Sequence, residues 1–263
     1  MTNSINDLFS ITGKTAVVTG GSRGIGRMIA DAFVSNGVKT YITARKVAAC
    51  QTTADELSAK GDCIALPADL STTEGRAAFV EEIKQREQSL DILVNNAGAA
   101  WGAAFDDYPE DGYDKVMNIN VKAVFMLTRD LLPLLLAQAS TTNPARVINI
   151  GSIDGLRVSA TDNFAYGASK AAVHFLTKNL ALRLGQRGLT INAIAPGPFE
   201  SEMMKHMLSQ YGEKINAENP LGRIGNPVDM GGLAVYLASP AASYVNGQVI
   251  ALDGGRHLGA RVD

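Results

Sequence analysis

The sequence contains little cysteine, no long apolar run and no sign of a leader segment. Its two cysteines, Cys50 and Cys63, give neither a disulfide framework nor a zinc-ligand spacing, so we predict no metal site. The most apolar stretch, residues 131–139, is too short to cross a bilayer and contains Pro133. The first residues have neither the basic nor the apolar region of a signal peptide. We therefore expect a cytoplasmic protein with no membrane partner.

The sequence also lacks an excess of charge of either sign. It has 24 Lys and Arg against 26 Asp and Glu, so no bulk electric field favours nucleic acid, and we expect no nucleic-acid partner. Hydrophobic residues make up 46% of the chain, which is enough for a large core and argues against disorder. Glycine is abundant, with 26 residues, and glycine is needed where the backbone turns tightly or approaches a ligand.

Short β-branched runs alternate with longer amphipathic segments along the chain. This alternation predicts parallel βαβ units with right-handed crossovers. The strands are expected at residues 15–19, 40–43, 63–66, 92–95, 146–150, 190–195 and 248–252. We therefore predict an α/β fold over residues 1–263: one doubly wound Rossmann domain, with a mostly parallel seven-stranded sheet flanked by helices.

Three segments stand outside this alternation. Residues 1–12 and 257–263 are expected to be loosely packed tails. Residues 197–222 contain several methionines and follow the sixth strand, at the edge of the sheet where ligands bind in such folds. We expect this segment to be a lid over an apolar substrate. The alternative is a surface helical hairpin that packs its apolar side on the core.

A glycine-rich turn follows the first predicted strand and opens a helix. Glycine there allows the tight turn and lets backbone N–H groups approach a pyrophosphate, and the helix N-terminus adds a favourable dipole. The pattern is weak alone, but it stands here in the strand–turn–helix context that a dinucleotide site requires. The predicted contacts with the dinucleotide are Gly20, Ser22, Arg23, Gly24, Ile25 and Gly26.

The end of the second predicted strand carries no carboxylate that could hold a ribose 2′-hydroxyl. Arg45 stands there instead, and Arg23 lies in the glycine turn, so both could neutralise a 2′-phosphate. We therefore predict NADP(H); the alternative is that both arginines are merely solvated. Asp69, followed by Leu70, comes after the third strand, and its carboxylate could accept from an adenine amino group.

A tyrosine and a lysine lie four residues apart in a predicted helix that runs to about residue 187. Tyr166 and Lys170 are thus one turn apart on the same face. A nearby ammonium group favours phenolate, so Lys170 is expected to lower the pKa of Tyr166. Ser152 ends the fifth strand fourteen residues before Tyr166, and its hydroxyl could bond a substrate oxygen.

Together these motifs resemble the short-chain dehydrogenase/reductase family over about residues 10–256. The matching pieces, in order, are residues 19–26, Asp69, residues 95–98, Asn120, Ser152, Tyr166 with Lys170, and Pro196-Gly197. Residues 91–98, 101–104 and 143–152 are most similar to the 3-oxoacyl-thioester reductase branch of the rhamnolipid type.

The resemblance implies a role for each matching residue. Tyr166 exchanges the proton with the carbonyl oxygen, Lys170 bonds the nicotinamide ribose, and Ser152 orients the substrate oxygen. Asn120 holds a water that connects Lys170 to solvent. The remaining cofactor contacts are Asn96, Ala97, Gly98, Pro196, Gly197, Phe199 and Ser201, the last standing where many relatives have threonine.

The expected reaction is NADPH-dependent reduction of a carbonyl to a secondary alcohol, with a 3-oxoacyl thioester as the expected small-molecule substrate. The alternatives are an NAD(P)-dependent secondary-alcohol or steroid dehydrogenase and a non-catalytic nucleotide-binding regulator. The resemblance also implies a homo-oligomer, usually a tetramer, through helices in residues 107–137 and 163–187. Residues 134–140 carry no charge, and this argues against docking of an acidic carrier protein.

Overall fold

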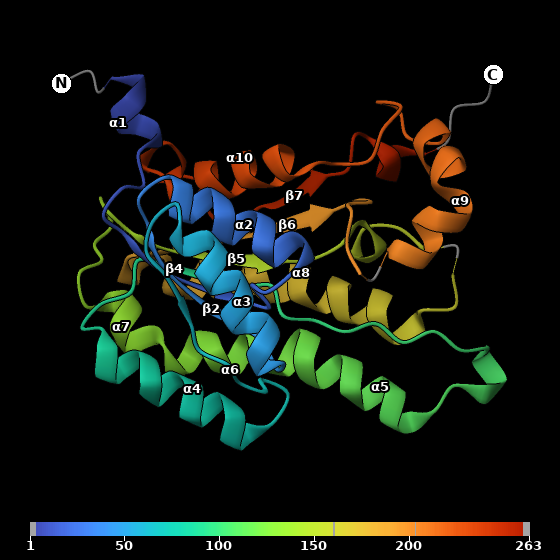
Figure 1. The fold of residues 1–263 in the computed structure, drawn as a ribbon, viewed down its shortest axis with the longest axis horizontal. Helices are drawn as coiled ribbons and strands as arrows, with labels where there is room; N and C mark the ends of the chain where they lie inside the picture. The colour runs from blue at the N-terminus through green and yellow to red at the C-terminus, as the bar shows by residue number, and fades with distance from the viewer. Residues whose placement is uncertain (1–3, 160, 203, 260–263) are drawn as a thin grey trace.

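The computed structural model describes residues 4–159, 161–202 and 204–259, without the side chain of His206. Its sheet has the order β3-β2-β1-β4-β5-β6-β7, and every described strand pair is parallel (Figure 1). The strands are β1 (Thr15–Thr19), β2 (Lys39–Thr43), β3 (Cys63–Ala65), β4 (Ile92–Asn95), β5 (Ala145–Ile150), β6 (Leu189–Pro196) and β7 (Val249–Leu252). The predicted fold class is therefore confirmed, and each predicted strand end lies within one residue of the observed one.

Helices cover both faces of the sheet. Helices α2 and α10 lie side by side on one face, whereas α4, α6 and α7 lie on the other (Figure 1). The helices are α1 (Ile5–Phe9), α2 (Gly24–Ser35), α3 (Val47–Ser58), α4 (Thr73–Arg86), α5 (Glu110–Met117), α6 (Ala123–Asp130), α7 (Leu132–Leu136), α8 (Phe164–Leu184), α9 (Lys205–Ala217) and α10 (Pro227–Ala238). Short helical turns are η1 (Phe105–Asp107), η2 (Asn118–Lys122), η3 (Ile153–Gly155), η4 (Gly185–Arg187), η5 (Pro240–Ala242) and η6 (Arg256–Leu258).

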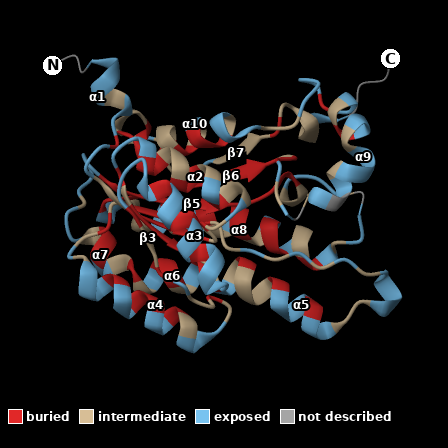
Figure 2. Cartoon of the chain, viewed as in Figure 1, coloured by how far each residue is buried: buried red, intermediate tan, exposed pale blue. Residues whose placement is uncertain are grey.

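Alternate residues of each central strand enter different halves of the core. Ala16 and Val18 of β1 pack with α2 and α10, whereas Val17 between them packs with α4 and α6. Strands covered in this way on both faces have continuous apolar sequences. This is why apolar runs, and not alternating apolar and polar residues, indicated these strands in the sequence. Buried residues accordingly fill the sheet, while the outer faces of the helices are exposed (Figure 2).

The two predicted tails differ from expectation where the structure describes them. Ile11 is 1% exposed and belongs to the core, and α1 before it begins with a capping box between Ser4 and Asp7. At the other end, the backbone and ring of His257 both hydrogen-bond Asp253. Residues 1–3 and 260–263 lie outside the described residues.

The segment predicted as a lid contains α9, which has a non-helical residue, Tyr211, near its middle. Met203 lies outside the described residues. In the described part of the chain, none of the helices combines the length and apolarity needed to cross a membrane.

Candidate active site

The glycine turn follows β1 at the carboxyl edge of the sheet. Gly20 and Gly24 have φ of +66° and +52°, a region that residues with side chains rarely adopt. A Cβ on Gly20 would lie 2.8 Å from Nδ2 of Asn96, so this backbone also has no room for a side chain. The turn then enters α2 at Gly24.

Hydrogen bonds fasten this turn to the segment that follows β4. Asn96 donates from Nδ2 to the carbonyl oxygens of Thr19 (2.8 Å) and Gly20 (3.2 Å). The Thr19 hydroxyl oxygen accepts from the backbone N–H groups of Asn96 (2.8 Å) and Ala97 (2.9 Å). Two of the predicted cofactor-binding segments are therefore parts of one rigid unit.

The start of α2 fits an anionic group. Arg23 occupies the N-cap position, and among the described residues its side chain makes no capping hydrogen bond. A helix N-terminus without a side-chain cap presents backbone N–H donors and a positive dipole end. The Cβ of Ser201 lies 3.2 Å from the position that a Cβ on Gly24 would take. The segment after β6 therefore contacts this turn. Of the other predicted residues, Ser22 lies in this turn, and Ile25 and Gly26 lie in the first turn of α2.

The predicted adenosine-side residues gather at the ends of β2 and β3. Arg45 is exposed and lies near Asp69. Hydrogen bonds from Ser71 lower the pKa of Asp69, and the positive charge of Arg45 lowers it further. Leu70 is buried in the core, so only its backbone is available to a ligand. Arg45 and Arg23 both have exposed side chains at this side of the molecule. The residues present fit a dinucleotide that carries an extra phosphate.

Three of the predicted catalytic residues converge where β5 ends beside the start of α8. Tyr166 and Lys170 lie in the first two turns of α8, with the Lys170 Nζ 5.5 Å from the ring centre of Tyr166. Ser152 follows β5 and accepts from the backbone N–H of Asp154 at 3.1 Å. Its side chain lies close enough to the Tyr166 phenol to lower the pKa of that phenol. The Lys170 ammonium donates to the carbonyl oxygen of Ile150 at 2.7 Å.

Burial dominates the protonation of this group. It raises the pKa of Tyr166 to about 12, although the Ser152 side chain acts in the opposite direction. Burial also lowers the pKa of Lys170 to about 8. The expected lowering of the Tyr166 pKa by Lys170 is therefore not the net effect. The physical reason is that desolvation of the phenolate outweighs the attraction of an ammonium group directed at the Ile150 carbonyl.

Asn120 lies in η2, a π-helical turn between α5 and α6. Its side chain exchanges two hydrogen bonds of 2.9 Å with the backbone of Ala99 and donates to the Ser169 hydroxyl at 2.9 Å. Ser169 in turn donates to the carbonyl oxygen of Tyr166 at 2.7 Å. Asn120 thus supports the start of α8 and also lies against Gly98. That it holds a water remains a prediction.

The segment expected beside a nicotinamide begins where β6 ends at Pro196. Gly197 continues the sheet pairing through a 3.0 Å hydrogen bond to the carbonyl oxygen of Leu252. Phe199 is buried and pairs with Gly225 in an isolated parallel bridge. The backbone thus leaves the end of β6 at Gly197, and by Ser201 it has reached the start of α2 at Gly24.

Sequence reasoning missed two side chains near the site. Ser169 was visible within the tyrosine–lysine motif, but nothing in the sequence indicated that it would link Asn120 to Tyr166. His174 is 5% exposed and packs against Gly151 and Gly155. Its position one turn after Lys170 was the available signal.

Among the described residues, no three His, Cys, Asp or Glu side chains come together as metal ligands.

Known proteins share both the sequence and this arrangement. A family model described as "Enoyl-(Acyl carrier protein) reductase" matches residues 17–257. The chain is 48% identical to the rhamnolipids biosynthesis 3-oxoacyl-[acyl-carrier-protein] reductase of Pseudomonas aeruginosa, over 95% of this chain and 98% of that protein. It is 32% identical to the 3-oxoacyl-[acyl-carrier-protein] reductase FabG of Vibrio cholerae, over 95% of this chain and 99% of that one.

Solved structures agree with these sequence relatives. The structure described as the Pseudomonas aeruginosa RhlG/NADP active-site complex superimposes with a TM-score of 0.93. The two chains are 48% identical, and the match covers 95% of this chain and 99% of the other. The chain belongs to the short-chain dehydrogenase/reductase family and is an oxidoreductase of that family. The predicted family is confirmed.

Proposed function

We propose that this protein reduces the 3-oxo group of an acyl thioester to a 3-hydroxyl group with NADPH. The observation that carries the proposal is the convergence of Ser152, Tyr166 and Lys170 at the sheet edge that also holds the glycine turn. Such a site places a proton donor beside a dinucleotide cradle. The two 3-oxoacyl reductases similar to this chain support the substrate class.

Each residue of the site has a distinct task in this reaction. Bound NADPH supplies the hydride to the carbonyl carbon. Tyr166 donates a proton to the carbonyl oxygen. Its phenol carries that proton at neutral pH, as an ordinary tyrosine does, and burial raises its pKa further. Ser152 donates a second hydrogen bond to the same oxygen as negative charge develops there. Lys170 provides a buried positive charge beside Tyr166, and Asn120 holds the start of α8 in place.

The arginines at the adenosine side support NADP(H) over NAD(H). Arg45 follows β2 and its charge acts on Asp69, while Arg23 occupies the N-cap position of α2. Both side chains are exposed, so two guanidinium groups are available to a 2′-phosphate. Residues Gly20 to Gly26, Asn96 to Gly98 and Pro196 to Ser201 would hold the rest of the dinucleotide. The NADP bound by the RhlG structure supports the same assignment.

Purified protein tests this proposal by oxidation of NADPH in the presence of acetoacetyl thioesters. We expect consumption of NADPH with the acetoacetyl group on coenzyme A or on acyl carrier protein, and a comparison of the two carriers decides whether a carrier protein docks. The Tyr166→Phe variant should lose roughly 10²- to 10⁴-fold in turnover while it still binds NADPH. Turnover by Tyr166→Phe equal to that of the unaltered protein would refute the assigned chemistry.

We also propose that the protein forms a homo-oligomer through α6 and α8. An apolar groove between α8 and the η2–α6 segment is lined by Val121, Lys122, Phe125, Ala172, Phe175, Leu176 and Asn179. Phe175 is 70% exposed and Phe125 40% exposed in the single chain, and exposed aromatic pairs of this kind are typical of interfaces. A tetramer is the form expected from the family.

The two cysteines support a cytoplasmic location. Cys50 and Cys63 are both free and buried, as is usual in a reducing compartment.

A further inference from the structure

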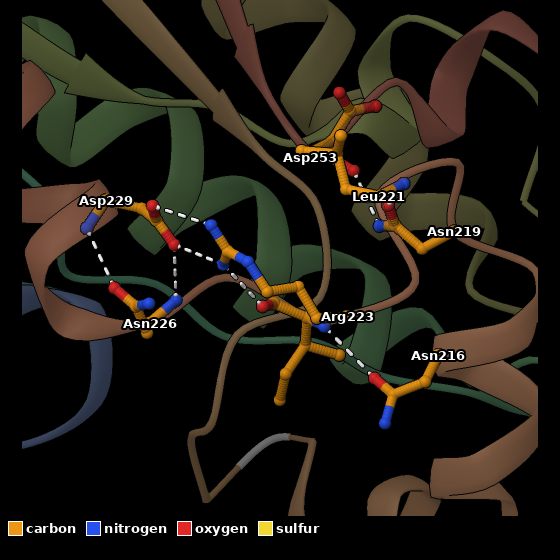
Figure 3. A network of polar contacts seen from close by, with 8 residues as sticks. Asn216, Asn219, Leu221, Arg223, Asn226, Asp229 and Asp253 are labelled. Atoms are coloured by element: carbon orange, nitrogen blue, oxygen red, sulfur yellow. Dashed lines mark hydrogen bonds and ion pairs between the residues drawn. The ribbon is translucent and has the colours of Figure 1, made fainter.

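One buried asparagine joins the end of α9 to the end of β7. Asn219 is 4% exposed and donates from Nδ2 to the carbonyl oxygen of Asp253 at 2.8 Å. Its Oδ1 accepts from the backbone N–H of Leu221 at 3.0 Å. Both halves of the amide are therefore used, and Figure 3 shows the side chain between the two segments. A carboxylate could replace the acceptor but not the donor, and an apolar side chain could replace neither.

The turn after β7 is shaped around this amide. Gly254 has a φ of +66°, and a Cβ there would overlap Oδ1 of Asn219. On its other side, a Cβ on Gly197 would lie 2.6 Å from Cβ of Asp253. Asp253 thus fills the space between Asn219 and the segment that follows β6. A displacement of Asn219 would reach Gly197 through this one residue.

The side chain of Asp253 is itself fixed. Its carboxylate accepts from the backbone N–H of Gly255 at 3.0 Å, and from the backbone N–H and ring Nδ1 of His257, both at 2.7 Å. Arg256 in the same turn donates to the carbonyl oxygen of Ile215 at 2.9 Å. The turn therefore forms a stable support for the carboxyl end of α9.

A second set of contacts joins the two ends of the segment that contains α9. Gly225 donates its backbone N–H to the carbonyl oxygen of Pro198 at 3.0 Å, and the ring of Phe199 occupies the space where a Cβ of Gly225 would be. The Asn216 side chain accepts from the backbone N–H of Ile224 at 3.0 Å. Both ends of the excursion from Phe199 to Gly225 are thus held close to the carboxyl edge of the sheet, as Figure 1 shows for α9.

We propose that Asn219 is a positioning residue: through Asp253 it sets α9 and the Gly197 segment in one fixed arrangement at the carboxyl ends of β6 and β7. Asn219 does not touch reacting atoms. Its effect on binding of an acyl substrate rests on the proposed function, whereas its effect on the order of α9 does not.

The test compares Asn219→Asp and Asn219→Ala with Asn143→Asp, which makes the same chemical change in an exposed loop. Hydrogen exchange of residues 205–217 is measured by mass spectrometry, together with the dissociation constant for NADPH and the kcat and KM for an acetoacetyl thioester. Because one buried hydrogen bond contributes about 1 kcal/mol, exchange in this segment should rise roughly 5- to 10-fold in both Asn219 variants. The KM should rise by a similar factor with kcat changed less, and Asn143→Asp should change neither.

The outcomes separate this proposal from the reductase assignment. If exchange in residues 205–217 is the same in Asn219→Asp as in Asn143→Asp, Asn219 does not hold α9 and the proposal is wrong. A lower unfolding temperature with unchanged KM and unchanged local exchange would also overturn it, because that is the result of a purely structural role. If the unaltered protein reduces no ketone, the function fails while the exchange measurement still decides the role of Asn219. Should Asn219→Asp not fold, Asn219→Ser takes its place in the test, because it also removes the amide that donates to Asp253 and adds no charge.

Discussion

The ammonium group of Lys170 lies 2.7 Å from the carbonyl oxygen of Ile150, the last residue of β5. This contact ties the helix that carries Tyr166 to the strand that precedes Ser152. It uses one of the three donors of the ammonium group and leaves the others available toward the site. The same contact holds the ammonium group in a buried position, and this burial lowers the pKa of Lys170 to about 8.

Replacement of Lys170 by methionine should therefore stabilise the fold while it removes activity. The folded-state pKa of Lys170, about 8, lies below its ordinary value of 10.5, so the unfolded chain binds the proton more tightly between these values. The penalty is fully present below pH 8 and disappears as the pH rises toward 10.5. We expect Lys170→Met to raise the unfolding temperature at pH 7, with a smaller gain at high pH, measured by thermal unfolding at several pH values.

Lys84→Met provides the control, since Lys84 lies exposed on α4. It should change neither the unfolding temperature nor its pH dependence appreciably. A Lys170→Met protein that is less stable than the unaltered protein at pH 7 would contradict the assigned burial penalty.

Arg45→Asp should reverse the preference between the two dinucleotides. The guanidinium group would bind a 2′-phosphate by charge-assisted hydrogen bonds of about 1.5–3 kcal/mol, so its loss should weaken NADPH binding roughly 10- to 150-fold. The aspartate would also repel the phosphate and could accept from a free ribose hydroxyl. Binding of NADH should change little or improve. Titration of intrinsic fluorescence with each dinucleotide measures both constants.

The matched variant is Arg187→Asp, at an exposed position in η4 after α8. It makes the same change in net charge. Equal weakening of NADPH and NADH by Arg45→Asp would mean that Arg45 does not read the phosphate.

His174 should make the fold sensitive to mild acid. Burial lowers its pKa to about 4, well below the ordinary 6.5, and the charge of Lys170 acts in the same direction. The unfolded state therefore takes up a proton between pH 6.5 and 4 that the folded state refuses, so this residue makes stability fall as the pH falls through that window. His174→Leu should flatten the slope of unfolding free energy against pH by up to one proton, as denaturant titrations would measure. An unchanged slope would show that folding does not lower the pKa of this ring.

Phe175→Glu should dissociate the proposed oligomer. A carboxylate in the apolar groove between α6 and α8 would have to be buried without a partner, which strongly opposes association. Light scattering after size-exclusion chromatography should show a smaller species. Tyr244→Glu, on a fully exposed side chain, should leave the mass unchanged. A protein that is already monomeric before substitution would contradict the proposal.

The sequence predicted the sheet well because its central strands are covered on both faces and so appear as apolar runs. Val17, Leu93 and Val147 needed no knowledge of their partners to be placed inside. The glycine turn and the Tyr166–Lys170 spacing were predictable for a similar reason: a positive φ and a helical turn are local properties.

What the sequence could not provide are contacts between distant segments. Nothing local places Asn219 against Asp253, 34 residues away, or directs the Lys170 ammonium at a backbone oxygen. The direction of the Tyr166 pKa was missed for the same reason, because desolvation depends on everything packed around the phenol. The burial of Ile11 likewise comes from the sheet and helices that surround it, not from its neighbours in the chain.

Asn96 holds the glycine turn through the ends of β1 and β4, while Arg45 stands apart at the end of β2. In the proposed function, Arg45 therefore adds to the coenzyme choice from outside the turn that holds the pyrophosphate. Exchange of the few residues after β2 would shift the preference between the two nucleotides without touching the residues assigned to proton transfer.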